Sequence, residues 1–269
     1  KTPVPSAQNW LLLLTYDGTC YQGWQVQPNS PTIQDILEQA IKRLTGESVK
    51  VHGAGRTDSG VHALNFTANF KTSTENFKTP EKWRIALNAV LPNDIVVKYA
   101  QTVSPEFHAR HSAIRKRYRY LICNLPYRPA FSRKQSWWIN QPLDIKRMEK
   151  AAKILIGEHD FSAFRAANCS SPSPLKNIHE ILISKKRFRY STLQIEFEAN
   201  SFLQHMVRII SGTLVEVGQG RKNIDEVAEA LESGQRELAG ITAPPHGLYS
   251  LDVIYPQGMI EWPMEVIDN

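Results

Sequence analysis

The order of strand-like and helix-like segments is the feature that most constrains how this chain can fold. Its first 104 residues read as strand, helix, two strands, helix and strand. The apolar run WLLLLTY is typical of a buried strand, whereas IQDILEQAIKRL carries the apolar stripe of an amphipathic helix. In that helix we expect Ser30 as N-cap, Pro31 at the first position and Gly46 at the end. The predicted strands are 10–16, 48–53, 64–70 and 94–100, and the predicted helices are 30–46 and 80–91.

The second part of the chain repeats this order without visible sequence repetition. Its predicted strands are 115–123, 179–188, 191–199 and 247–255, and its predicted helices are 144–157, 202–218 and a short one at 224–233. Two consecutive βαββαβ units predict an α+β protein built from two tandem ferredoxin-like halves with a cleft between them. We expect an N-terminal domain at 1–104 and a C-terminal domain at 105–269, with the boundary near Pro105.

Composition narrows the class of protein. Hydrophobic residues make up 42% and charged residues 22% of the 269 residues, as in ordinary globular proteins. The net charge of +6 favours a polyanionic partner such as nucleic acid, although many basic proteins bind none. Residues 105–135 hold eight basic side chains and a single acid, which indicates either a solvated basic face or a surface for such a polyanionic partner.

The cysteine and histidine patterns predict no metal site and no disulfide framework. The three cysteines lie far apart and form no CxxC pair, so a reducing cytoplasm is the expected setting. His108 and His111 fit one helix face, but the neighbouring Arg110 and Arg115 disfavour a cation there. The sequence shows no apolar run of membrane-spanning length and no signal-peptide pattern, so we expect no membrane association.

The segment GAGRTDSGVHA, residues 53–63, presents one carboxylate, Asp58, on a glycine-rich loop between the second and third predicted strands. A plain turn is one interpretation. A phosphate cradle fits poorly, because the glycine spacing differs from GxGxxG and no Gly-Lys-Ser/Thr follows. The tripeptide DSG also occurs in aspartic proteases, but that chemistry needs a second carboxylate, which only a homodimer would supply here.

GAGRTDSGVHA closely resembles the signature of the tRNA pseudouridine synthase A family, the tRNA pseudouridine(38–40) synthases. Further blocks resemble that family in the same order: LTYDGTCYQGWQ, FHARHSAIRKRYRY, DFSAFR, FLQHMVRIISGTLVEVG and APPHGLYSLDVIYP. Together they span most of the chain. The family's two-domain α+β fold, the pseudouridine synthase fold, agrees with the duplicated element order.

The resemblance implies isomerisation of uridine to pseudouridine in the anticodon stem-loop of tRNA, with no cofactor or metal. It assigns the essential carboxylate to Asp58. Arg56 is then suited to fill the stack vacated by a flipped nucleotide and to hold phosphate. Tyr118 is the ring against which the uracil packs, Arg208 is a partner for Asp58, and Leu248 lines the uracil pocket. The family acts as a homodimer on tRNA.

Several assignments leave alternatives open. Tyr118 and Tyr120 share one strand face and either can be a core aromatic; the family pattern selects Tyr118. Leu248 also fits a core leucine. Lys176 stands where the family has an arginine, at a possible RNA contact, and the residues after Pro256 match no block. A non-catalytic RNA-binding protein and a dimeric aspartic protease are the alternative functions.

Overall fold

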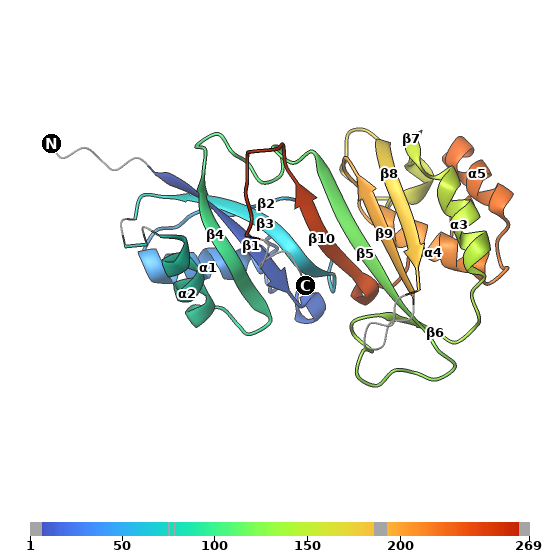
Figure 1. Cartoon of the computed structure of the whole chain (residues 1–269), viewed down its shortest axis with the longest axis horizontal. Coiled ribbons are helices and arrows are strands. Elements are labelled where there is room, and N and C mark those ends of the chain that lie inside the picture. Colours follow the sequence, from blue (N-terminus) through green and yellow to red (C-terminus); the bar gives the residue numbers. More distant parts are fainter. Residues whose placement is uncertain (1–6, 75, 78, 186–192, 264–269) are drawn as a thin grey trace. The chain divides into compact units, whose positions relative to one another are not determined.

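The computed structural model describes residues 7–74, 76–77, 79–185 and 193–263. The chain divides into two compact units (Figure 1). Unit 1 comprises Lys1–Ile114 and Ser250–Asn269, and unit 2 comprises Arg115–Tyr249. The predicted division into domains 1–104 and 105–269 stays a prediction, because compactness does not establish which segment folds by itself.

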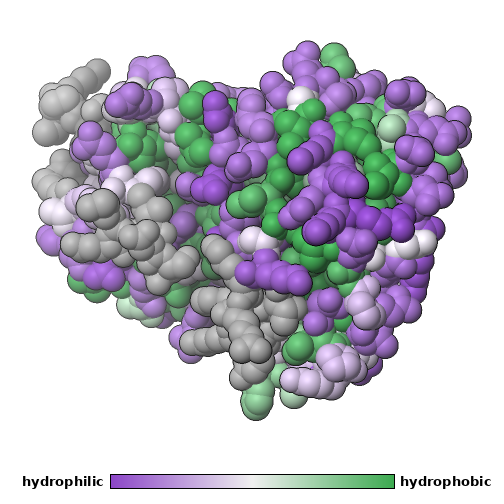
Figure 2. Space-filling view, turned by 45° about the vertical axis from the view of Figure 1, so that its right-hand side comes forward, coloured by the Kyte–Doolittle hydropathy of each residue, from purple (hydrophilic) through white to green (hydrophobic). Residues whose placement is uncertain are grey.

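The predicted α+β class is confirmed. The described residues form five α-helices, and the strand pairing is mostly antiparallel. Hydrophilic side chains cover much of the face drawn in Figure 2, and apolar side chains lie between them.

Unit 1 has the predicted order of strands and helices. Strand β1 pairs antiparallel with both β3 and β4, and β2 pairs antiparallel with β3. The elements are β1 (Gln8–Tyr16), α1 (Ile33–Thr45), β2 (His52–Gly53), β3 (His62–Thr72), α2 (Pro80–Val90) and β4 (Ile95–Val103).

Helix α1 begins later than the sequence predicts. Its N-cap is Thr32, whose hydroxyl accepts from the backbone N–H of Asp35, so Ser30 is not the cap and Pro31 precedes the helix. The backbone explains the delay, because Gln22 N–H donates to Pro31 C=O and holds this stretch extended. Gly46 ends the helix at φ 79°, as predicted.

Both faces of the unit 1 sheet are covered. On one face, Trp10, Leu12 and Leu14 of β1 pack in a cluster with buried residues of α1 and α2. On the other face, Leu11 packs in a second cluster with Phe107 and Tyr255. Strand β1 therefore has apolar residues at consecutive positions, and not only at alternate ones, because both of its faces are buried.

Unit 2 contains more strands than the sequence predicts. Strand β5 pairs antiparallel with β9 and parallel with β6, and β8 pairs antiparallel with β9 and β7. The elements are β5 (Arg115–Asn124), β6 (Trp137–Ile139), α3 (Ile145–Ile154), β7 (Gly157–Asp160), β8 (Leu175–Ser184), β9 (Leu193–Ala199), α4 (Met206–Gly218) and α5 (Ile224–Ser233). Strand β10 (Leu248–Ile254) begins in unit 2 and ends in unit 1.

Two predicted helices are too long, and glycine or a left-handed residue explains each error. Helix α3 ends at Ile154, because Gly157, at φ 110°, opens strand β7. Helix α4 starts at Met206 rather than 202, since His205 has the left-handed φ of 63°. Strands β6 and β7 were missed because they are only three and four residues long. The predicted hairpin ends at 186–188 and 191–192 lie outside the described residues.

Helix α4 is buried along most of its length and closely approached by the chain at 240–243. A Cβ on Gly212 would lie 1.9 Å from the Ile241 carbonyl oxygen, and one on Gly240 would lie 2.6 Å from Thr213 Cα. Gly240 N–H donates to Thr213 Oγ1 at 2.8 Å. The two glycines thus let the segment before β10 lie directly on α4.

Candidate active site

The loop that carries Asp58 runs from β2 to β3 in unit 1. Ala54 N–H donates to Thr67 C=O at 2.9 Å, and Val61 N–H donates to Asp58 C=O at 3.2 Å. The first bond ties the start of the loop to β3, and the second closes a turn within the loop. Asp58 is half-buried and Arg56 is exposed, so both residues of this loop have surface in contact with solvent.

Residues 16–24 hold this loop on both sides of Asp58. Thr57 receives two contacts: Tyr16 Oη lies 3.0 Å from Thr57 Oγ1, and Trp24 N–H donates to Thr57 C=O at 3.1 Å. After Asp58, Gly60 N–H donates to Tyr21 C=O at 3.2 Å. The backbone that carries the carboxylate is therefore fixed by a segment more than thirty residues earlier in the chain.

The loop backbone approaches residues 16–24 so closely that two positions in that segment require glycine. A Cβ on Gly18 would lie 1.9 Å from the Val61 carbonyl oxygen. Gly23 has φ 84°, and its Cβ would lie 2.3 Å from the Thr57 carbonyl oxygen. Only glycine fits either position. Sequence reasoning missed this role, and its signal was the glycine spacing in YDGTCYQGW.

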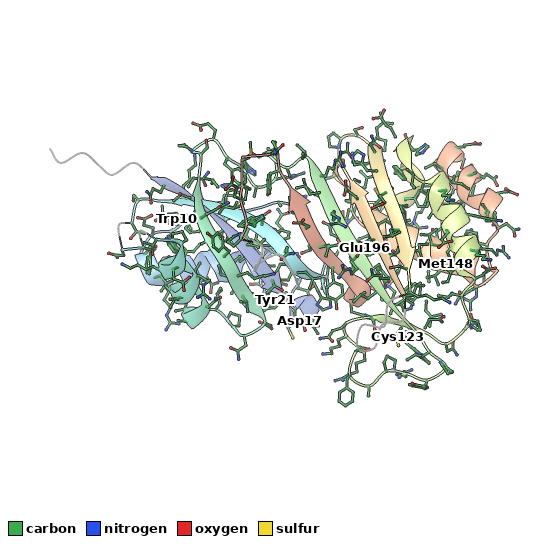
Figure 3. All side chains as sticks on the ribbon, viewed as in Figure 1. Trp10, Asp17, Tyr21, Cys123, Met148 and Glu196 are labelled. Carbon is green, nitrogen blue, oxygen red and sulfur yellow. The ribbon has the colours of Figure 1, made fainter. Side chains whose placement is uncertain are left out.

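Asp17 and Tyr21 fasten the same end of unit 1 (Figure 3). Asp17 Oδ1 lies 3.0 Å from Nδ1 of the buried His62, directly after the loop. The hydrogen bond from His62, together with those from Thr19, holds the pKa of Asp17 well below its usual value. Tyr21 Oη donates to Asp94 Oδ1 at 2.5 Å, and burial raises the pKa of Tyr21.

The two tyrosines left open by the sequence have different surroundings in unit 2. Tyr120 is fully buried, and its hydroxyl donates to Pro244 C=O at 2.7 Å. Burial raises its pKa well above the usual value. Tyr118 is half-buried and lies edge-on to Phe202, with ring centroids 5.1 Å apart. Tyr120 is thus a core residue, whereas part of Tyr118 is open to solvent.

Arg208 and Leu248 also lie in unit 2. Arg208 Nε donates to Ala243 C=O at 2.8 Å, and Ala243 N–H donates to Arg208 C=O at 3.1 Å. Leu248 is buried at the start of β10. Arg56 and Asp58 therefore belong to unit 1, and Tyr118, Arg208 and Leu248 belong to unit 2. The pairing of Arg208 with Asp58 stays a prediction.

The basic strand β5 is more neutralised than its sequence indicates. Arg115 pairs with Glu198 at 2.7 Å, and Arg119 pairs with Glu196 at 2.7 Å. Both glutamates lie on β9, and Glu196 is labelled in Figure 3. Strand alternation puts these arginines on the face opposite Tyr118, and Lys116 on the same face as Tyr118. Carboxylate partners thus reduce the charge that this stretch offers to RNA.

Lys176, where the resemblance led us to expect an arginine, is buried and donates to the carbonyls of Ser173 and Leu175 at 2.7 and 2.8 Å. Burial lowers its pKa. Its ammonium group is engaged by the local backbone.

A groove of about 230 Å³ lies beside the Asp58 loop within unit 1. It brings together residues from the loop, from the holding segment around Trp24, and from the turn at 107–112, three stretches that are distant in the sequence. Its lining consists of Trp24, Gln25, Gln34, Lys50, Val51, His52, Gly53, Gly55, Arg56, His108, Arg110 and His111.

Comparison with known proteins identifies the family. The sequence model described as tRNA pseudouridine synthase matches residues 13–112 and 151–256. A protein named tRNA pseudouridine synthase A from a Thermoanaerobacter species is 51% identical over 92% of this chain and 100% of its own length. The chain belongs to the tRNA pseudouridine synthase family. Proteins of the same name from Geotalea uraniireducens and Coxiella burnetii are 45% and 43% identical, covering 91% and 90% of this chain and 98% and 91% of their own lengths.

As a member of this family, the chain is an isomerase that forms pseudouridine from uridine in tRNA. Membership sets aside the aspartic protease and the non-catalytic RNA-binding protein. The matched ranges contain Arg56, Asp58, Arg208 and Leu248, whereas Tyr118 falls between them. Among the described residues, no helix is both long enough and apolar enough to cross a membrane.

Proposed function

We propose that this isomerase acts on uridines 38–40 of the tRNA anticodon stem-loop and that Asp58 is its catalytic carboxylate. The observation that carries the proposal is the fixation of the Asp58 loop. Backbone bonds from Trp24 and to Tyr21 hold the residues on either side of Asp58, while its side chain stays half-exposed. A fixed, accessible carboxylate suits nucleophilic or electrostatic participation in a reaction that needs a defined approach.

The reaction balances without a cofactor. The bond between N1 of uracil and C1′ of ribose breaks, the base turns, and a bond forms between C5 and C1′. One proton leaves C5 and one is taken up at N1, so nothing is oxidised or reduced. The group that the protein must supply for this isomerisation is one carboxylate.

The other proposed residues prepare the target nucleotide. Because a stacked base is out of reach, the uridine is flipped out, and Arg56 takes its place and holds phosphate. Tyr118 packs against the uracil, Leu248 lines its pocket, and Arg208 pairs with Asp58. The exposure of Arg56 and the partial exposure of Tyr118 support these roles.

We also propose the finer architecture of two tandem ferredoxin-like halves, divided as 1–104 and 105–269. Its support in unit 1 is the order β4-β1-β3-β2 with antiparallel pairing throughout. In unit 2 the run β5-β9-β8 has the same antiparallel pairing. The protein is proposed to act as a homodimer in the cytoplasm, with tRNA as its partner.

The decisive experiment replaces Asp58 by Asn, which keeps the shape and removes the charge. We expect tritium release from tRNA labelled at C5 of uracil to fall to background, while tRNA binding persists because phosphate contacts dominate affinity. Asp225→Asn, an exposed acid on α5, is the matched control and should release tritium at the unaltered rate. Turnover by the Asp58→Asn protein, with deamidation excluded by mass spectrometry, would remove Asp58 from this role.

A further inference from the structure

The basic groove of unit 1, defined above by its lining residues, carries several basic side chains besides Arg56 to which the proposed function assigns no role. It carries three imidazoles, two guanidinium groups and one ammonium group, and none of its described lining residues is acidic. We propose that this groove binds a backbone phosphate of the tRNA and that its histidines couple this binding to proton uptake. The inference rests on the proposed function, since it takes tRNA as the ligand.

The three histidine rings of the groove contact one another in sequence, each pair at a tilted angle. The ring centroids of His52 and His108 are 4.8 Å apart, and those of His108 and His111 are 4.3 Å apart. Arg110 N–H donates to Nδ1 of His108 at 3.1 Å. The neutral His108 ring therefore carries its proton on Nε2, which makes that nitrogen a hydrogen-bond donor of the kind a phosphate oxygen accepts.

The surrounding charges favour an anion. Burial and the neighbouring Lys50 lower the pKa of His52, and Lys71 and His111 act in the same direction. Burial, then His111, His52 and Arg110, lower the pKa of His108. Arg56 adds a further positive charge on the lining.

Glu38 is an acid whose charge acts on one of these histidines, and it raises the pKa of His52. Its carboxylate accepts from Gln34 Nε2 at 2.9 Å and from Val51 N–H at 3.0 Å, so it is already engaged in the groove wall. An arriving phosphate would counter the positive groups that lower the pKa of His52 and of His108. Their pKa values would rise, so binding takes up protons and tightens as the pH falls.

The size and make-up of the groove favour a phosphate within an RNA strand. Its volume of about 230 Å³ is below the range of about 300–1,000 Å³ that encloses a small ligand. Among the described residues, no group of three His, Cys, Asp or Glu side chains is arranged to hold a metal ion. The groove also includes Arg56, so a strand bound there continues to the loop that carries Asp58.

The test measures tRNA affinity between pH 6 and 8.5 at constant ionic strength for five proteins. These are the unaltered chain, His52→Gln, Lys50→Gln, and two matched controls on exposed positions, His179→Gln and Lys82→Gln. We expect the affinity of the unaltered chain to rise several-fold as the pH falls, and His52→Gln to flatten that rise. Lys50→Gln should lower the slope of log affinity against log salt by somewhat less than one. Both controls should match the unaltered chain.

The proposal would be overturned if the tRNA affinity of His52→Gln depended on pH as that of the unaltered chain does. It would also be overturned if Lys50→Gln left the slope of log affinity against log salt unchanged. Thermal unfolding of each variant distinguishes a loss of binding from a loss of folding. Because Lys50 is exposed, we expect Lys50→Gln to fold normally even if His52→Gln does not. Inorganic phosphate is titrated in a parallel arm. If it binds this groove while the variants bind tRNA normally, the groove takes free anions and the proposal fails. Tritium release by the unaltered chain tests the proposed function separately.

Discussion

Thr57, directly before Asp58, shows how single residues fix the candidate site. Its hydroxyl contacts Tyr16 and its carbonyl accepts from Trp24 N–H, so side chain and backbone are both held by another segment. Thr57 is buried, whereas Arg56 before it is exposed. A buried neighbour with two contacts limits how far the Asp58 carboxylate can move.

Asp17 supports this end of unit 1 in a pH-dependent way. Because its pKa is lowered in the folded state, its ionised form stabilises the fold at pH values above the ordinary pKa of 3.8. That contribution is lost as the pH falls below 3.8 towards the folded value. We expect Asp17→Asn to lower the free energy of unfolding by about 1 kcal/mol at pH 7, a small figure because the side chain is 43% exposed.

Urea unfolding at pH 7 and at pH 3 checks this prediction. The difference between the Asp17→Asn protein and the unaltered protein should be smaller at pH 3. A difference that stays constant between the two pH values would mean that Asp17 acts through shape and not through its charge. Asp225→Asn serves as the exposed control.

At the scale of elements, the turn at 17–24 works as a support for the Asp58 loop. It follows β1, and its glycines admit the loop backbone at distances that a side chain would block. Gly18 and Gly23 are needed here because two irregular segments can pack this closely only where Cβ atoms are absent.

Gly23→Ala tests this support, and Gly46→Ala is its matched control. Both glycines have positive φ, 84° and 79°, so either alanine incurs the left-handed strain of about 1 kcal/mol. Only at Gly23 does the new Cβ meet a backbone atom, the Thr57 oxygen at 2.3 Å; nothing lies within 4 Å at Gly46. We expect Gly23→Ala to slow pseudouridine formation about tenfold or more, since small displacements of reacting groups are costly.

Single-turnover rates at saturating tRNA, with thermal unfolding measured in parallel, separate the two effects. Gly46→Ala should lower the unfolding temperature and leave the rate unaltered. If both alanines slow the reaction equally, the contact between Gly23 and Thr57 has no part in holding Asp58.

At the scale of the whole molecule, the C-terminal segment returns to unit 1. Tyr255 is buried there, and its hydroxyl donates to Ala109 C=O at 2.7 Å and lies 2.6 Å from Thr67 Oγ1. Residues 67, 109 and 255 thus meet at one buried point. Unit 1 is completed only by residues that follow unit 2 in the sequence.

Tyr255→Phe should therefore destabilise the protein. Removing the hydroxyl takes a hydrogen-bond partner away from the Ala109 carbonyl and from the Thr67 hydroxyl, both buried. We expect this to lower the free energy of unfolding by about 1–3 kcal/mol. Tyr249→Phe is the matched control, because the Tyr249 hydroxyl donates to Gln135 C=O at an exposed position and its loss should cost less. Urea unfolding of both variants gives the comparison, and equal losses would contradict the special role of Tyr255.

The sequence by itself determined the order of elements in unit 1, the α+β class, the end of α1 at Gly46 and the loop that carries Asp58. Each depends on local patterns: apolar periodicity, glycine at helix ends and a short recognisable motif. Family membership followed from blocks of sequence, and the comparisons confirmed it.

Only the tertiary structure decided what local patterns leave open. Thr32, not Ser30, caps α1, because Gln22 reaches across to hold Pro31 extended. Tyr120 is a core residue and Tyr118 is half-exposed, since two residues on one strand face meet different neighbours. The arginines of β5 have glutamate partners on β9, and three histidines from two distant segments share one groove. Each of these features depends on contacts between residues that are apart in the sequence. The local sequence around either partner gives no sign of such a contact.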